Sequence, residues 1–195
     1  MSSREKILSA IASNKPDLVD MPLIDVEKVI SYTHLKHQFK ETLEKIGGKV
    51  IFLENEDQLK EQIKSSITEN EFVINTLELA EDKKTEIRNL SSYDLASLEK
   101  AYLRGHIGVA ENGAIWVDEL QMVNRLVPFI CQHLFIVIKE ENLVATMHHA
   151  YKNINVTQTG FGSFIAGPSK TADIEQSLVI GAHGARSLTV YIIEN

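Results

Sequence analysis

The stretch His133-Leu-Phe-Ile-Val-Ile-Lys139 decides the expected fold, because it places five consecutive apolar residues between polar ends. A strand that is apolar on both faces is typical of a parallel sheet that is covered on both sides. Shorter runs of the same kind lie at 49–53, 72–74 and 187–193, and apolar residues with helical spacing lie between them. This alternation predicts an α/β fold built on a mostly parallel sheet.

A local antiparallel hairpin is expected in the middle of the chain. Residues 107–110 and 114–117 are mostly apolar, and they flank Glu111-Asn112-Gly113. Asn-Gly is a strong signal for a tight turn between antiparallel strands. A further strand is expected at 161–166.

Several segments are expected to be helical. The longest, 25–46, carries apolar residues every three or four positions and ends at Gly47-Gly48, a typical C-cap. Asn55 with Gln58 begins another helix. The remaining helices are expected at about 3–14, 93–104, 140–153 and 170–180.

The first helix has a clear start signal. Ser2 and Glu5 fit a capping box, and Ile7, Leu8 and Ile11 form a short apolar stripe behind it. A helix this short is weakly stable alone. It is therefore expected to dock on its own domain or on a partner subunit.

The composition excludes several classes of protein. The chain has 195 residues, a formal net charge of −7 at pH 7 and one cysteine, Cys131. This length fits one main domain, expected over 25–195 after an N-terminal helix and connector at 1–24. The acidic charge argues against nucleic-acid binding, and one cysteine alone supports neither a disulfide framework nor a cysteine-ligated iron–sulfur cluster. No apolar run is long enough to cross a membrane and no secretion signal is recognised, so a cytoplasmic protein is expected.

Glu111 is the first candidate for chemistry. A carboxylate at a strand end beside a glycine can act as a nucleophile toward a thioester or as a general base. The alternative is a plain tight turn in which Asn112-Gly113 supplies the positive φ and Glu111 faces water, and the residues alone favour this alternative. Arg125 lies in an otherwise apolar segment. It is expected to pair with Glu111 or with an anionic ligand.

The run Gly167-Pro-Ser-Lys-Thr-Ala-Asp173 is the second candidate, at the start of the helix expected over 170–180. With Ser169 as the N-cap, the open amides and the Ser169 and Thr171 hydroxyl groups can hold a phosphate or carboxylate. Asp173 already compensates part of the helix dipole. A capped turn without a ligand is therefore the alternative that the local residues favour.

The third candidate is His183, which lies between two glycines in Gly181-Ala-His-Gly184. It serves either as a general acid or base or as a hydrogen-bonded loop histidine. His106 and His133 precede expected strands, but nothing local assigns them a role. No metal site is expected, because His34 and His37 lack a third ligand nearby and the neighbours His148 and His149 point apart on a helix.

These segments are expected to meet in one crevice, because open α/β sheets bind ligands beyond the carboxyl ends of their strands. The candidate catalytic residues are Glu111 and His183. The candidate binding residues are Arg125, Gly167, Ser169, Thr171, Asp173, Gly181 and Gly184.

Taken together, these motifs resemble the LUD-domain family, of the lactate-utilisation protein C type that is also called YkgG. The segments that carry the resemblance are 108–114, 125–130, the strand at His133, 167–175 and 181–184. The run Gly-Pro-Ser-x-Thr-Ala-Asp-Ile-Glu is the specific part. The resemblance covers essentially the whole chain.

The resemblance implies a NagB/RpiA/CoA-transferase-like fold, in which a mostly parallel sheet lies between helices in three layers. It also implies a part in oxidising L-lactate to pyruvate together with two iron–sulfur partner proteins. This chain would bind a small anion or organic acid, or act as a scaffold, and would hold no cofactor by itself.

Two departures from the family bear on the site. The family usually has threonine at the position of Asn112 and proline at the position of Ala185. The first change brings the segment closer to the Glu-Asn-Gly of class I coenzyme A transferases, whose glutamate is the nucleophile. A stand-alone transferase using Glu111 is therefore the alternative, with enzyme activity left open. It would require a homodimer, because one small chain lacks the second half-site.

Overall fold

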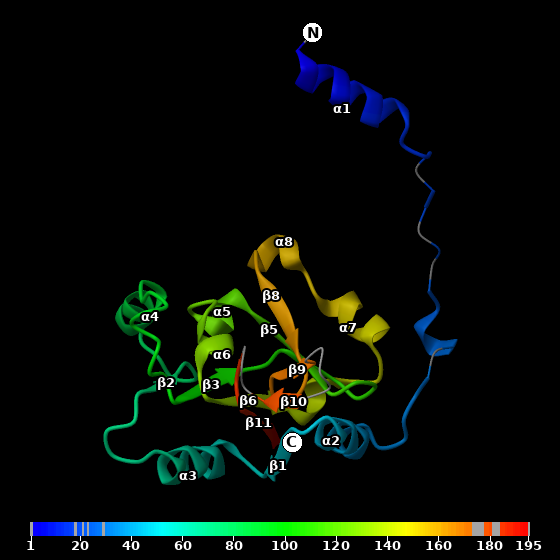
Figure 1. Ribbon diagram of the computed structural model, residues 1–195. Coiled ribbons are helices and arrows are strands. Elements are labelled where there is room, and N and C mark those ends of the chain that lie inside the picture. The colour runs from blue at the N-terminus through cyan, green and yellow to red at the C-terminus, as the bar shows by residue number, and fades with distance from the viewer. Residues whose placement is uncertain are drawn as a thin grey trace.

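The computed structural model describes residues 2–17, 19, 20, 22, 24–28, 30–172, 178–180 and 184–194. They form an α/β body from which the first helix stands apart (Figure 1). The helices are α1 (Ser3–Ser13), η1 (Val26–Lys28), α2 (Leu35–Lys45), α3 (Glu56–Ser66), α4 (Glu81–Arg88), α5 (Glu119–Met122), α6 (Val127–Ile130), η2 (Glu140–Asn142), α7 (Met147–Asn153) and α8 (Val156–Thr159). The strands are β1 (Lys49–Leu53), β2 (Val73–Asn75), β3 (Lys100–Arg104), β4 (Ile107–Val109), β5 (Ala114–Asp118), β6 (His133–Lys139), β7 (Leu143–Val144), β8 (Gly162–Ile165), β9 (Lys170–Ala172), β10 (Leu178–Ile180) and β11 (Ser187–Ile193).

The predicted parallel sheet is confirmed. Five strands lie in the order β1-β11-β6-β3-β2, and every neighbouring pair is parallel. The run at 133–139 is the central strand β6, and its residues alternate between two apolar clusters on opposite faces of the sheet. Leu134, Ile136 and Ile138 lie in one cluster and Val137 in the other. Burial of both faces explains why this run is apolar throughout.

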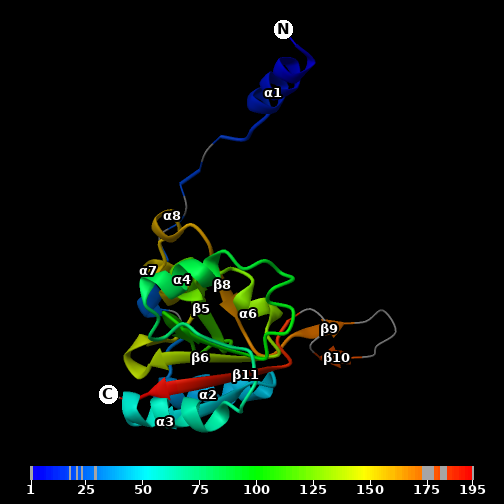
Figure 2. The ribbon, with the colours of Figure 1, turned by 90° about the vertical axis from the view of Figure 1, so that its left-hand side faces the viewer.

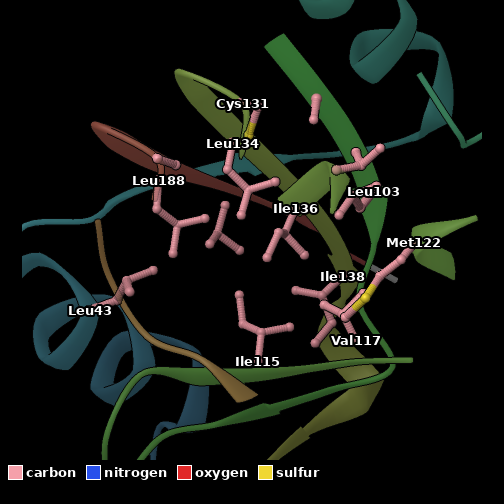
Figure 3. Close-up of a cluster of buried hydrophobic side chains, with 14 of the residues drawn as sticks. Leu43, Leu103, Ile115, Val117, Met122, Cys131, Leu134, Ile136, Ile138 and Leu188 are labelled. Atoms are coloured by element: carbon pink, nitrogen blue, oxygen red, sulfur yellow. The ribbon is translucent and has the colours of Figure 1, made fainter. Parts of the chain in front are cut away.

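Different partners cover the two faces of the parallel sheet. On one face, Ile115 and Val117 of β5 pack with Leu43 of α2 against the side chains of β6 (Figure 3). On the other face, Leu59 and Ile63 of α3 lie in the cluster that includes β6. The main core is therefore enclosed between the parallel sheet and a second sheet.

The predicted antiparallel hairpin is part of this second, four-stranded sheet, ordered β7-β4-β5-β8. Strands β4 and β5 are antiparallel, with Ile107 opposite Trp116, and β8 extends the antiparallel pairing from β5. Helix α7 covers the outer face, where Ala150 packs with Val109 and Trp116. The hairpin therefore forms the middle of a second structural layer.

The first helix is confirmed with its capping box. The Ser2 hydroxyl accepts from the Glu5 amide at 3.2 Å, and the Glu5 carboxylate accepts from the Ser2 amide at 2.6 Å. Its apolar stripe is exposed, and none of the residues of α1 is buried in the described part of the chain. Docking on its own domain is therefore not observed, while docking on a partner subunit and a domain boundary at residue 24 stay predictions.

The helix predicted over 25–46 is wrong in its first half. Among the described residues of that half, the structure has only the short turn η1, and α2 begins at Leu35. Residues 30–33 are weak helix formers, which explains why the regular helix starts after them. The predicted end is confirmed, since Gly47 adopts a φ of +92° directly after the helix.

The helix predicted over 93–104 is also wrong, because β3 occupies its second half and pairs with both β2 and β6. Leu95, Leu98 and Tyr102 are all buried, and their spacing of three and four residues imitates a helical face. Tyr102 faces the α3 side of the sheet, whereas Ala101 and Leu103 face the main core. That alternation belongs to a strand.

Two further helix predictions are corrected. The segment 140–153 is divided into η2, the strand β7 and the helix α7, because β7 completes the second sheet beside β4. The segment 170–180 contains no helix among its described residues. Its two ends, β9 and β10, pair antiparallel, and Figure 2 shows them where β11 begins, away from the C-terminus.

Among the described residues, no helix combines the length and the apolar character that crossing a membrane requires.

Candidate functional site

Glu111 lies in the turn between β4 and β5, where its exposed carboxylate accepts a hydrogen bond from the Met147 amide at 3.0 Å. Met147 is the first residue of α7, so the carboxylate caps that helix and faces its positive end. Gly113 has a φ of +69°, as the tight-turn interpretation requires. A Cβ at Gly113 would also lie 3.0 Å from the Leu43 Cα. This geometry gives Glu111 a structural role and fits the plain-turn alternative.

Arg125 does not pair with Glu111, so that alternative is wrong, while pairing with an anionic ligand stays a prediction. Its Nε and Nη2 donate to the two carboxylate oxygens of Glu119 at 2.8 and 2.9 Å, and its guanidinium lies 5.1 Å from the Phe161 ring centroid. The hydrogen bonds from Arg125 lower the pKa of Glu119. Glu111 precedes β5 and Arg125 follows it, so a strand about 16 Å long separates the two.

Part of the predicted binding site does assemble. The Ser169 amide donates to the Ala185 carbonyl at 2.8 Å, and a Cβ at Gly184 would lie 3.1 Å from the Ser169 Cβ. Gly167 has a φ of +73°, and a Cβ there would lie 2.9 Å from the Ile46 carbonyl oxygen. Gly167, Ser169 and Gly184 line one small, mainly apolar crevice of about 240 Å³ with Phe129. We refer to it as the Ser169 crevice.

The other predicted residues do not complete this crevice in the described part of the chain. Neither Glu111 nor Arg125 is among its described lining residues. Thr171 belongs to the strand β9, so the helix N-terminus that was expected to hold an anion there is not formed. Asp173, Gly181 and His183 lie outside the described residues.

The position of the Ser169 crevice also differs from the prediction. Ala185, which pairs with Ser169, precedes β11, and the next residue, Arg186, donates its amide to the carbonyl of Gln132, which precedes β6. The crevice therefore lies at the amino ends of the parallel strands. Open α/β sheets usually bind ligands at the carboxyl ends of their strands, and these ends lie at the opposite edge of this sheet.

At the carboxyl edge, the structure shows a histidine–aspartate pair. His106 Nε2 lies 2.7 Å from Asp118 Oδ2, and the Asp118 side chain is only 4% exposed. The other oxygen, Oδ1, accepts from the amides of Leu120 and Gln121 at 2.9 and 3.2 Å. These bonds hold the carboxylate in place, and the carboxylate in turn orients the imidazole. A histidine held in this way is suited to donating or accepting a proton.

A cavity of about 490 Å³ opens beside this pair, with His106 and Asp118 in its wall. Gly105 lets the chain pass directly from β3 to β4 here, because a Cβ at that residue would lie 2.5 Å from the Ile115 Cγ2. Sequence reasoning left His106 without a role. The expected hairpin could have revealed the proximity of His106 and Asp118, because its register places residue 106 opposite residue 117, next to Asp118.

Cys131 is buried, and burial raises the pKa of its thiol to about 12. The thiol therefore stays protonated at neutral pH, and this disfavours roles as a nucleophile or a metal ligand. Within the described ranges, no group of three or more histidine, cysteine, aspartate or glutamate side chains is placed to hold a metal ion.

Comparisons with known proteins identify the relatives of the chain. It is 28% identical over 120 residues to lactate utilization protein C of Shouchella clausii (strain KSM-K16), an alignment that covers 58% of this chain and 51% of the relative. It is 24% identical to lactate utilization protein C of Geobacillus sp. (strain WCH70), over 98% of this chain and 79% of the relative. The chain thus spans about half the length of the first of these curated relatives.

A solved structure supports the fold. The crystal structure of a DUF162 family protein from Deinococcus radiodurans superposes with a TM-score of 0.62 at 18% identity, covering 88% of this chain and 99% of the other. The sequence profile of the LUD domain matches residues 36–193, which include both sheets. This match covers most of the chain and confirms the resemblance seen in the motifs. The protein belongs to the LUD domain family.

Proposed function

We propose that this protein is a cytoplasmic component of L-lactate utilisation that acts with iron–sulfur partner proteins in the oxidation of lactate to pyruvate. The observation that carries the proposal is the alignment with lactate utilization protein C of Geobacillus over 98% of this chain. The cysteine content supports a division of labour. A chain with one buried cysteine cannot ligate an iron–sulfur cluster by itself, so electron carriers of that class belong to partners.

The contribution of this chain is to bind a small organic acid in the Ser169 crevice. Three of the residues singled out from sequence, Gly167, Ser169 and Gly184, line this crevice. A Cβ at Gly184 would lie 3.1 Å from the Ser169 Cβ, so a larger residue at position 184 would crowd Ser169. The crevice is small, as a ligand with the few heavy atoms of lactate requires.

Growth tests the role in lactate utilisation. A strain lacking the gene is expected to fail on L-lactate as the only carbon source and to grow normally on pyruvate. Growth on pyruvate is the control that separates lactate oxidation from later metabolism. Unchanged growth on L-lactate would refute the proposed role.

Affinity purification tests the partners. A tagged copy from lactate-grown cells is expected to retain proteins that contain iron and acid-labile sulfide. Recovery of this chain alone under mild conditions would count against the iron–sulfur partners.

Calorimetry tests the crevice. L-lactate and pyruvate are titrated into the wild type and into Ser169→Ala, with Ser65→Ala as an exposed serine control on α3. Removal of a hydrogen bond to a charged ligand is expected to weaken binding about 10-fold or more in Ser169→Ala only. Equal affinities in all three proteins would remove the ligand from this crevice, while the growth result would still decide the role in lactate utilisation.

A further inference from the structure

We propose that the 490 Å³ cavity beside His106 binds an uncharged, hydroxyl-bearing ligand of about monosaccharide size, with one ligand hydroxyl group hydrogen-bonded to the His106 imidazole. The cavity is distinct from the Ser169 crevice, because it opens on the outer face of the second sheet, where Ile107, Trp116 and Val144 lie. It also borders the carboxyl ends of the parallel strands, since His106 comes shortly after β3 and η2 follows β6. Ligands of open α/β sheets bind at this edge, and cavities of this volume hold small molecules.

The orientation of His106 is fixed by contacts of both its side chain and its backbone. Its Nε2 is engaged at 2.7 Å with the buried carboxylate of Asp118, and its backbone amide donates to the Trp116 carbonyl at 2.9 Å. With Nε2 acting as the donor to Asp118, Nδ1 is the ring atom that can serve a ligand. The His106 side chain is 42% exposed although its partner is buried. The buried Asp118 carboxylate fixes the imidazole, and the imidazole stays accessible. Its Nδ1 can therefore accept a hydrogen bond from a ligand hydroxyl group.

The charge of the cavity wall favours an uncharged ligand. Asp118 and Glu141 contribute carboxylates, and none of the described lining residues is a lysine or an arginine. Lys139 lies 3.4 Å from Glu141 but is not among the described lining residues, so a ligand carboxylate or phosphate would face two carboxylates in the wall itself. The described lining of the Ser169 crevice contains no acidic residue. The polar remainder consists of amides and a hydroxyl group, supplied by Asn142, Asn153 and Thr159 among others. Such groups pair with the hydroxyl groups of a neutral ligand.

The apolar part of the cavity wall favours a ligand that also has a hydrocarbon surface. Ile107, Trp116, Val144 and Ile154 line the cavity together with the polar groups. Trp116 is held in place by Phe164, whose ring centroid lies 5.0 Å from its own. A sugar-like ring presents C–H groups as well as hydroxyl groups, so it can cover an apolar wall while its hydroxyl groups reach His106 and the asparagines.

The fluorescence of Trp116 provides the test, because Trp116 is the only tryptophan of the chain and lines the cavity. The purified chain is titrated to tens of millimolar with ribose, glucose and myo-inositol as uncharged probes, and with L-lactate as an anionic probe. At least one uncharged probe is expected to change the emission with saturation, whereas L-lactate is expected to give no saturable change.

Two variants assign the signal to His106. Glutamine at this position keeps a nitrogen that can donate to Asp118 but removes the equivalent of Nδ1, so His106→Gln is expected to weaken binding about 10-fold with the fold retained. His148→Gln changes an exposed histidine on α7 and is the matched control, with wild-type affinity expected. Far-ultraviolet circular dichroism checks that both variants fold. Failure of every uncharged probe to saturate, saturation by L-lactate alone, or wild-type affinity in His106→Gln would overturn the proposal.

Discussion

Replacement of Asp118 by alanine is expected to destabilise the protein far more than loss of an ordinary helix cap. The Asp118 side chain accepts hydrogen bonds from the amides of Leu120 and Gln121 and is paired with His106. Loss of the cap costs about 1 kcal/mol, and loss of a hydrogen bond to a buried charge costs about 1.5–3 kcal/mol. The expected loss of unfolding free energy is therefore about 2–4 kcal/mol.

Urea unfolding followed by circular dichroism measures this loss, and Asn55→Ala supplies the control. Asn55 is an exposed N-cap that accepts from the Gln58 amide at 3.0 Å, so its replacement is expected to cost about 1 kcal/mol. Asp118→Asn keeps an oxygen for the α5 amides and is expected to lie between the two. For a chain of this size, the loss in Asp118→Ala corresponds to a decrease of roughly 5–15 °C in melting temperature.

The comparison of Asp118→Ala with Asn55→Ala decides whether the histidine–aspartate pair stabilises the fold. A loss in Asp118→Ala no larger than that in Asn55→Ala would show that the pairing with His106 contributes nothing. The idea that Asp118 fixes the orientation of the His106 imidazole would then be refuted, because a contact that fixes a side chain is expected to contribute to the free energy of unfolding. A much larger loss in both Asp118→Ala and Asp118→Asn would indicate that the negative charge is essential.

Three other outcomes follow from single sites. Gly113→Ala is expected to cost about 1–3 kcal/mol in urea unfolding, because the new Cβ must adopt a positive φ and approach the Leu43 Cα to 3.0 Å; a loss below about 0.5 kcal/mol would contradict the tight turn. Hydrogen bonds from Lys100 and, to a lesser extent, from Thr68 lower the pKa of Glu71 to about 2, below its usual 4.5, so the stabilisation is complete above pH 4.5 and is lost as the pH falls toward 2. Carboxyl NMR titration should show a higher pKa of Glu71 in Lys100→Met than in the wild type, while the hydrogen bonds from Thr68 keep it below 4.5; an unchanged value would contradict the role of Lys100. Cys131, with a pKa of about 12, should resist a thiol reagent at pH 8 until urea unfolds the chain, and rapid labelling of the native protein would exclude its burial.

The sequence is sufficient to predict the strands that are buried on both faces and the strands that are joined by a tight turn. β6 and β11 contain long apolar runs, and the β4–β5 hairpin is announced by Asn112-Gly113. β3 is missed because Leu95, Leu98 and Tyr102 have helical spacing by coincidence, although only the last of them lies in the strand. Periodicity alone cannot separate a turn followed by a short strand from a helix of the same length.

The candidate site is less predictable because its residues meet through tertiary contacts. The proximity of Ser169 and Gly184 could be anticipated, since the loops that contain them border strands of one sheet. Which edge of the sheet they occupy depends on the direction in which β11 is entered, and the residues near Ser169 do not encode that direction. The partner of Arg125 was misassigned for a similar reason, because Glu119 is close in sequence but becomes its neighbour only through the bend after β5.

The two edges of the parallel sheet offer different chemistry, which bears on the proposed role of this domain in a multi-protein oxidation. The Ser169 crevice at the amino edge is mainly apolar, whereas the cavity at the carboxyl edge contains the His106–Asp118 pair and a second carboxylate from Glu141. β6 runs from one edge to the other, a span of about 20 Å. At that separation two unit charges interact by only about 0.8 kcal/mol for an effective dielectric constant of about 20, so a charge bound at one edge has a small direct effect on the other. Communication between the edges would therefore require movement of the packed core around Leu134, Ile136 and Ile138, and a core buried this completely resists such movement. The two proposed sites, one at each edge, are therefore expected to bind their ligands independently of each other.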